Sequence, residues 1–255
     1  MTSLLLLAIG FSAGLLGALM GLGGGIIVVP ALTQLFGVPF RAAVAASLVT
    51  IVASSSASSA AYVGRDQVDL RVAVILELAT VAGALFGSAV AGLLPVLALK
   101  LLFAALAFYV AATLWLRRHA ASDSMQVGSY EVRRWGTGLG VAGLAGAVSG
   151  LLGVGGGAFK VPAMTLAMGL PFKVAAATSN FAIGVTAAVS AYLYYGRGDL
   201  DPLLAAPVVI GVFVGARAGT RALAKLPAKR LQGTFAILLL FIGVRMVWDA
   251  LGGGR

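Results

Sequence analysis

A glycine-rich run interrupts the apolar sequence at the same place in two copies of one unit. Residues 21–25 read GLGGG and residues 153–157 read GVGGG, 132 positions later. Paired, interrupted apolar segments in two halves of a chain are typical of transporters, in which they point to the substrate site. The same spacing, without a gap, relates Pro30 to Pro162, Gly37 to Gly169, Ser47 to Ser179, Tyr62 to Tyr194, Asp69 to Asp201, Gly87 to Gly219 and Phe103 to Phe235.

The composition of the chain is that of a membrane protein. Of its 255 residues, 60% are hydrophobic and only 10% are charged, which is unusual for a soluble domain of this size. A bilayer core of roughly 30 Å takes about 20 helical residues to cross, and all backbone groups inside it must be paired. We therefore predict an all-α polytopic membrane protein with two repeats of about five helical segments each.

Ten apolar segments divide the chain into two membrane repeats. The first repeat covers residues 1–116, the second covers 135–255, and a polar linker at 117–134 joins them. The segments are expected near residues 2–20, 26–36, 42–63, 70–92, 95–116, 135–152, 158–168, 174–195, 202–224 and 231–251.

Local signals support these boundaries. Asp69 and Asp201 stand just before apolar runs, and Pro202 follows the second of them. An aspartate at the N-cap with proline at the first helical position is a helix start. Gly37 and Gly169 suit helix C-caps, because glycine adopts the left-handed backbone that such caps use.

The second segment of each repeat is too short to cross a bilayer. Each glycine break therefore either joins two parts of one crossing helix or forms the tip of a hairpin that enters and returns. With hairpins most Lys and Arg residues fall on the linker side, whereas with single crossings the two sides carry nearly equal numbers. Positive residues accumulate in cytoplasmic loops. We thus predict re-entrant hairpins, two inverted repeats, a cytoplasmic linker at 117–134 and both termini outside.

The glycine triplets are candidate substrate contacts. A helix that starts at such a break leaves unpaired N–H groups and a partial positive charge at its N-terminus. Glycine lets a ligand approach these amides closely, and two such helix starts that meet near the midplane make an anion site. The alternative is tight helix packing, for which small residues are also common. The residues concerned are Gly23, Gly24 and Gly25 in the first copy and Gly155, Gly156 and Gly157 in the second.

Polar residues at the start of the third segment of each repeat are further candidates. They are Ser47 and Thr50 in the first copy and Thr178, Ser179 and Asn180 in the second. Neutral donors of this kind bind an oxyanion without burying a full charge. The alternative is that they bond to backbone carbonyls of their own or a neighbouring helix.

Two charged residues lie within apolar segments. Lys160 follows the second triplet, where the first copy has Val28, and Glu77 lies in a segment whose second copy has Val209. Charges inside a membrane are costly and point to function. Lys160 is a candidate counter-charge for an anion, or it snorkels to the interface. Glu77 is a candidate for carrying a coupled proton, or it forms a lipid-shielded pair with a basic residue.

Other functional classes find no support in the residues. The chain has no cysteine and one histidine, His119, so it offers no set of zinc ligands. Motifs of nucleotide-binding loops and hydrolases are absent. The net charge of +10 is spread over loops and helix ends, which determines topology and does not favour nucleic-acid binding. We expect no cofactor, no metal and no enzymatic activity, and we expect a small anion and the lipid bilayer as partners.

The motifs taken together resemble the TauE/SafE family of sulfite exporters and organosulfur-anion permeases. GLGGG at 21–25 is followed by Pro30, by GVP at 37–39 and by ASL at 46–48. Ala46 stands where the family commonly has a hydroxyl residue. The second half repeats the pattern as GVGGG at 153–157, Pro162, GLP at 169–171 and TSN at 178–180.

The resemblance implies a multi-pass permease of the inner (plasma) membrane that moves sulfite, sulfonates or similar small anions. Together with the residues, it predicts a secondary transporter that binds its substrate at the midplane and works by alternating access. Export is favoured because the inside-negative potential drives anions outward. Two alternatives stay open: an anion channel, and a permease for a carboxylate without sulfur.

Overall fold

The computed structural model describes residues 2–117, 127, 130–223 and 228–252. These residues form ten helices and no strand, as the all-α prediction required. The remainder of the predicted linker, including His119, lies outside the described residues. The helices are α1 (Thr2–Met20), α2 (Gly25–Phe36), α3 (Phe40–Val63), α4 (Leu70–Ala91), α5 (Val96–Arg117), α6 (Trp135–Leu152), α7 (Gly157–Leu166), α8 (Phe172–Gly196), α9 (Pro202–Leu223) and α10 (Ala228–Ala250).

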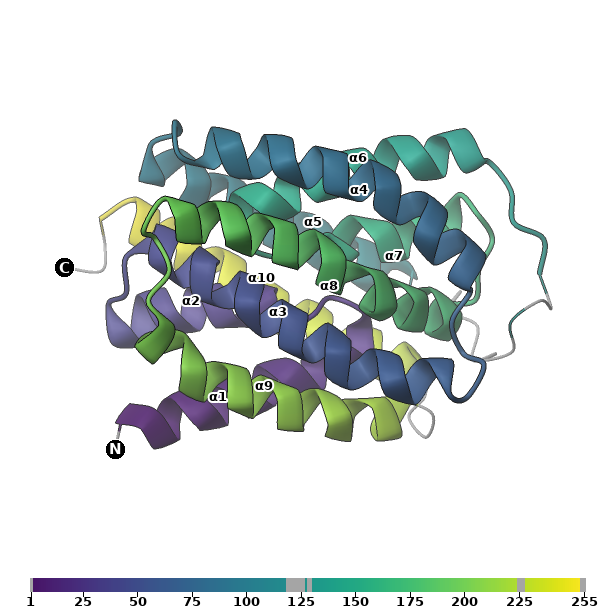
Figure 1. The fold of residues 1–255 in the computed structure, drawn as a ribbon, viewed down its shortest axis with the longest axis horizontal. Helices are drawn as coiled ribbons and strands as arrows, with labels where there is room; N and C mark the ends of the chain where they lie inside the picture. Colours follow the sequence, from purple (N-terminus) through teal and green to yellow (C-terminus); the bar gives the residue numbers. More distant parts are fainter. Residues whose placement is uncertain (1, 118–126, 128–129, 224–227, 253–255) are drawn as a thin grey trace.

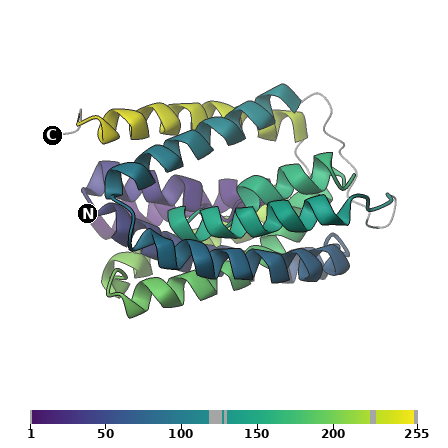
Figure 2. The ribbon, with the colours of Figure 1, turned by 90° about the horizontal axis from the view of Figure 1, so that it is seen from above.

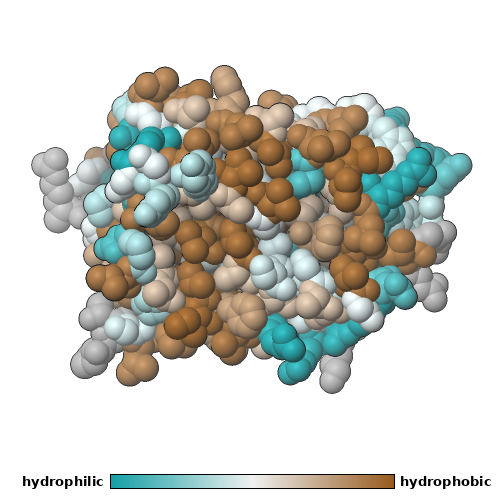
Figure 3. All heavy atoms as spheres, in the orientation of Figure 1, coloured by the Kyte–Doolittle hydropathy of each residue, from teal (hydrophilic) through white to brown (hydrophobic). Residues whose placement is uncertain are grey.

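Length separates the helices into two groups. Within the described part of the chain, eight helices are long and apolar enough to cross a membrane, whereas α2 has 12 residues and α7 has 10. At about 1.5 Å per residue the two short helices reach only about 18 Å and 15 Å, roughly half of a bilayer core. Apolar side chains cover most of the middle of the visible surface, and hydrophilic ones gather toward its two ends (Figure 3).

The expected helix ends agree with the structure at all but one position. Asp69 caps α4 by accepting a hydrogen bond from the amide of Val72 at 3.0 Å, and Asp201 caps α9. Gly37 caps α2 with a φ of 63°. The prediction for Gly169 was wrong, because α7 ends at Leu166 and is capped by Ala167. Gly169 has a φ of 83° and serves the turn that leads into α8.

The chain reverses direction at each glycine break. α1 and α3 begin at the same end of the bundle, so α2 runs back beside α1 (Figure 1). In the second half α6 and α8 begin together at the opposite end (Figure 1). Gly24 packs on the backbone of Ala13, and Gly156 packs on that of Ala145. Both short helices are therefore the returning arms of hairpins.

Helices of the two halves pack in reciprocal pairs. α1 packs on α9 and α4 packs on α6, while α3 packs on α8 and α5 on α10. Exchanging each helix with its repeat counterpart leaves this set of pairs unchanged. α3 and α8 run in opposite directions at the centre (Figure 1), and α5 and α10 lie along one flank (Figure 2). These pairings support the prediction of two inverted repeats, which remains a prediction.

Glycines let the paired helices approach closely. In the α4–α6 pair, a Cβ on Gly146 would overlap the carbonyl oxygen of Thr80, and a Cβ on Gly83 would overlap that of Gly143. Gly215 of α9 stands in the same relation to α1. Small residues at membrane helix contacts allow such backbone approach, which supplies van der Waals contact where lipid offers no hydrophobic drive.

We predict that Gly146→Ala weakens the α4–α6 contact. The new methyl group must push the two backbones apart, which costs about 1–3 kcal/mol of unfolding free energy. Thermal unfolding of the detergent-purified protein measures the loss. Gly136→Ala is the matched control on the same helix, because a Cβ there meets no atom within 4 Å. Equal stability of the two variants would contradict the packing argument.

Candidate functional site

The two glycine breaks have the same backbone form. Each turns through left-handed conformations that L side chains rarely adopt. This conformation, rather than helix propensity, requires glycine in the middle of each run. The φ angles are 71° at Gly23, 82° at Gly24, 82° at Gly155 and 73° at Gly156.

The breaks of the two halves meet inside the bundle. A Cβ on Gly25 would overlap the carbonyl oxygen of Gly153, and a Cβ on Gly157 would overlap that of Gly21. All four positions are buried. The start of each short helix therefore packs directly on the other half's break, and glycine is needed there for the close approach.

Two serines join the breaks by hydrogen bonds. Ser47 on α3 donates to the carbonyl oxygen of Gly153 at 2.6 Å, and Ser179 on α8 donates to that of Gly21 at 2.8 Å. Each hydroxyl thus pairs a carbonyl that the opposite break leaves free. A serine has one O–H proton, so neither hydroxyl can donate to an anion while these bonds persist.

The other predicted polar residues have separate partners. Thr50 donates to a carbonyl of the preceding turn of α3 at 2.7 Å. Thr178 accepts from the amide of Asp69 at 3.0 Å, at the start of α4. Asn180 donates through Nδ2 to the carbonyl of Ala18 at 2.7 Å. Its Oδ1 atom is buried without a hydrogen-bond partner among the described residues, which leaves one polar atom of the predicted site unused.

Lys160 and Glu77 form a buried ion pair. The Nζ atom of Lys160 lies 2.8 Å from Oε2 of Glu77, and the two residues are 1% and 8% exposed. The second carboxylate oxygen accepts the amide of Thr186 at 2.8 Å and also its hydroxyl. The pair links α4 of the first half to α7 and α8 of the second. Lys160 therefore does not snorkel, and Glu77 has the basic partner that one reading of the sequence predicted.

Thr186 was missed from the sequence, although a signal for this cluster exists there. Both charges stand where the other repeat has valine, at Val28 and Val209. Two unmatched charges of opposite sign in a duplicated membrane unit suggest that they pair with each other. Thr186 matches Ser54 and carries no comparable sign of its role.

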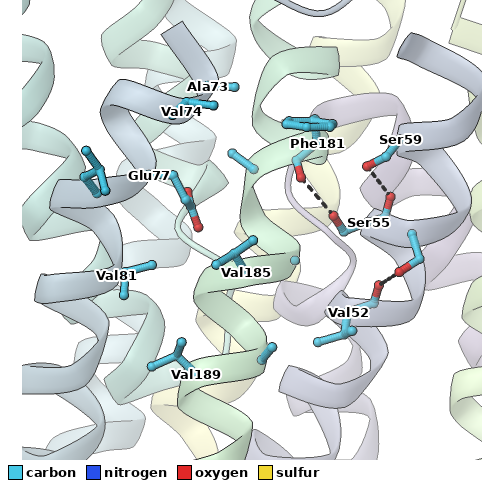
Figure 4. Close-up of a pocket in the computed structure, with 15 residues that line it drawn as sticks. Val52, Ser55, Ser59, Ala73, Val74, Glu77, Val81, Phe181, Val185 and Val189 are labelled. Atoms are coloured by element: carbon cyan, nitrogen blue, oxygen red, sulfur yellow. Dashed lines mark hydrogen bonds between the residues drawn. The ribbon is translucent and has the colours of Figure 1, made fainter. Parts of the chain in front are cut away.

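A cavity of about 940 Å³ lies between α3, α4 and α8, and Glu77 forms part of its wall (Figure 4). The carboxylate points toward α8 in this view, and Ser55 and Ser59 face the cavity from α3. Lys160 and the glycines of the breaks do not line it. The lining residues are Val52, Ser55, Ser56, Ser59, Ala73, Val74, Glu77, Leu78, Val81, Phe181, Ala182, Gly184, Val185, Ala188 and Val189.

Tyr130, from the end of the linker, closes over the start of α4. Its hydroxyl donates to Oδ2 of Asp69 at 2.9 Å. Burial, together with the neighbouring Asp69 carboxylate, raises the pKa of Tyr130 well above its usual range. The phenol therefore keeps its proton at physiological pH and remains a donor to the residue that caps α4 and contacts Thr178.

Comparison with known proteins identifies the family. The family model described as "Sulfite exporter TauE/SafE" matches residues 6–246. The chain belongs to the TauE/SafE family. A probable membrane transporter protein, YunE of Bacillus subtilis (strain 168), is 28% identical over 272 residues, with 98% of this chain and 99% of that protein covered. A probable membrane transporter protein of Xylella fastidiosa (strain 9a5c) is 32% identical over 244 residues, with 94% and 91% covered.

Similarity of this TauE/SafE chain to its relatives extends over nearly its full length, so the family resemblance of the two glycine motifs is confirmed. No solved structure gives a significant match. The protein is a multi-pass membrane transporter. Substrate binding by the glycines, Ser47, Thr50, Lys160, Thr178, Ser179 and Asn180, and coupling by Glu77, remain predictions.

We predict that Lys160→Met destabilises the protein by about 3–5 kcal/mol, because it leaves the buried carboxylate of Glu77 without its counter-charge. The double variant Lys160→Met/Glu77→Gln should recover much of this loss. Thermal unfolding in detergent compares the three proteins. The matched control is Lys100→Met, which removes the more exposed Lys100–Asp249 pair (22% and 27% side-chain exposure) and should cost about 1 kcal/mol or less. A double variant no more stable than Lys160→Met would refute the pairing energy.

Proposed function

We propose that the protein is a secondary transporter of small sulfur-containing anions, such as sulfite or an organic sulfonate, in the inner (plasma) membrane. The observation that carries this proposal is Lys160, a cation with 1% exposure within the spanning bundle of a TauE/SafE chain. A buried lysine in a membrane protein marks an ion or substrate pathway. It stands in the first turn of α7, directly after the second glycine break.

The proposed binding site lies between the two breaks, near the middle of the bilayer. Each short helix starts there, so two partially positive helix ends and Lys160 attract an anion from both halves. Asn180, whose Oδ1 atom has no partner in the described structure, rotates its amide to donate to the substrate. Ser47 and Ser179 exchange their carbonyl partners for the anion when the two breaks separate.

Alternating access follows from the reciprocal helix pairs. Rocking of one half against the other opens the site to one side and then to the other, as in transporters built from inverted repeats. The membrane potential supplies about 2.3 kcal/mol per 100 mV for each charge that crosses. With an inside-negative potential this favours export of the anion, and the chain carries the solute unchanged rather than converting it.

Transport in proteoliposomes tests the proposal. We expect flux of sulfite or methanesulfonate that is stimulated by the same anion on the opposite side. Lys160→Met should lower the rate about tenfold or more, since it removes the counter-charge. Lys100→Met should transport at the wild-type rate, with all rates compared per monodisperse protein. Anion conductance without stimulation from the opposite side would favour a channel, and flux of carboxylates alone would favour a permease without sulfur specificity.

Orientation is tested by cysteine accessibility. The chain contains no cysteine, so single substitutions report without background. A membrane-impermeant maleimide should label Val127→Cys, in the linker, only from the cytoplasmic side. It should label Leu251→Cys, after α10, only from the outside. Labelling of both positions from the same side would exclude the inverted-repeat topology.

A further inference from the structure

We propose that Glu77 is the internal counter-ion of Lys160 and that a transported anion displaces it, so that one anion and one proton bind together. This inference rests on the proposed function and specifies its coupling. The substrate takes the place of the carboxylate on the lysine ammonium group. Glu77 moves away and takes a proton from solvent, which leaves a neutral carboxylic acid beside a lysine–anion pair.

Charge balance in the membrane interior is the first argument. The Glu77–Lys160 pair is neutral as a whole, and its two charges are 2.8 Å apart. An anion that binds without a proton leaves one net negative charge in a medium that solvates ions poorly. An anion that binds with a proton leaves the net charge at zero. Binding of the anion and protonation of Glu77 therefore favour each other.

The surroundings of Glu77 provide no other charge to compensate. α6, which packs along α4, carries no titratable side chain, and α7 carries only Lys160. α8 contributes the amide and hydroxyl of Thr186, which are neutral donors. The remaining titratable groups of α3 and α8 lie near the helix ends: Arg41, Tyr62, Lys173, Tyr192, Tyr194 and Tyr195.

The positions of the two side chains give the second argument. Glu77 lines the cavity between α3, α4 and α8, whereas Lys160 does not (Figure 4). Side-chain exposure is 10% for Glu77 and 1% for Lys160. The carboxylate thus stands between the cavity and the ammonium group. A carboxylate that leaves Lys160 has adjoining space to enter, with the hydroxyls of Ser55, Ser56 and Ser59 on the opposite wall.

The place of Lys160 in α7 gives the third argument. It lies in the first turn of that helix, where the backbone dipoles add positive potential to its own charge. Its side chain runs past the second break, and a Cβ on Gly156 would lie 3.7 Å from its Cε atom. A cation at an amide-rich helix start is the environment that an oxyanion prefers. In the absence of substrate, Glu77 supplies that negative charge.

A purely structural ion pair makes a different prediction. Such a pair ties α4 to α7 and contributes to stability, but it does not link anion affinity to pH. The measurement that separates the two roles is the number of protons taken up when an anion binds. Methanesulfonate is the suitable probe, because a sulfonate stays ionised over the pH range in which the protein is folded and thus contributes no proton of its own.

The experiment is titration calorimetry of the full-length protein in nanodiscs. We expect the dissociation constant of methanesulfonate to fall about tenfold for each pH unit between about pH 8 and about pH 6. Buffers with different ionisation enthalpies should report about one proton taken up per anion. Both results come from the wild-type protein and need no variant.

Two variants assign the proton to Glu77. Glu77→Gln should bind methanesulfonate with an affinity that is independent of pH and without proton uptake. The anion should also raise its melting temperature more than that of the wild type, because Lys160 then lacks an internal partner. Lys160→Met should bind no methanesulfonate. The control Asp249→Asn, which disrupts the Lys100 pair on α5 and α10, should keep the wild-type pH dependence and proton count.

The outcomes separate this inference from the proposed function. Methanesulfonate binding by the wild type without proton uptake overturns the inference and leaves anion transport standing. The same holds if Glu77→Gln keeps the wild-type pH dependence. A wild-type protein that neither binds nor transports methanesulfonate, sulfite or a carboxylate at any pH overturns the proposed function, and the inference falls with it.

Discussion

A membrane interior offers no water to the backbone groups that a broken helix leaves unpaired, and here each half of the chain supplies partners for the other's break. Ser47 pairs the carbonyl of Gly153, and Ser179 pairs that of Gly21. These reciprocal bonds, together with the backbone contact that the glycines permit, hold the two hairpin tips against each other. Neither half completes this arrangement alone, so the breaks persist only where the repeats meet.

The scaffold is nearly symmetric, and the chemistry placed on it is not. Matched glycines, serines and tyrosines keep the same roles in both halves, whereas Glu77, Lys160 and Asn180 have apolar counterparts in the other repeat. All three lie on elements that contact the opposite half or bond to it. A duplicated unit provides two equivalent half-sites, and a single charge in one of them suffices to make an anion site directional.

The polar groups around the breaks are committed to partners in this conformation. The serine hydroxyls donate to carbonyls, and the lysine pairs with a carboxylate. A transporter that alternates between two states must break such contacts between its halves and form others, and an anion that replaces them makes the exchange affordable in a medium without water. The apolar cavity beside Glu77 lies where α4 of one half meets α3 and α8.

Much of the fold was determined by the sequence alone. The ten segments, the caps at Asp69, Asp201 and Gly37, and the hairpins follow from hydropathy, local capping chemistry and the distribution of positive charge. Such features depend on neighbours along the chain and on the bilayer, so they can be recognised without a structure. The failure at Gly169 is local as well, because α7 ends before the glycine that the pattern singled out.

The tertiary structure alone decided which polar groups meet. Glu77 and Lys160 are 83 positions apart and lie in different repeats, and Thr186 joins them from a third helix. Ser47 and Ser179 reach carbonyls of the opposite half rather than an open site. Periodicity states which residues face inward, but the partner that each one finds depends on how the two halves pack. That packing is governed by backbone approach at the glycines, for which no local signal in the sequence specifies the facing residue.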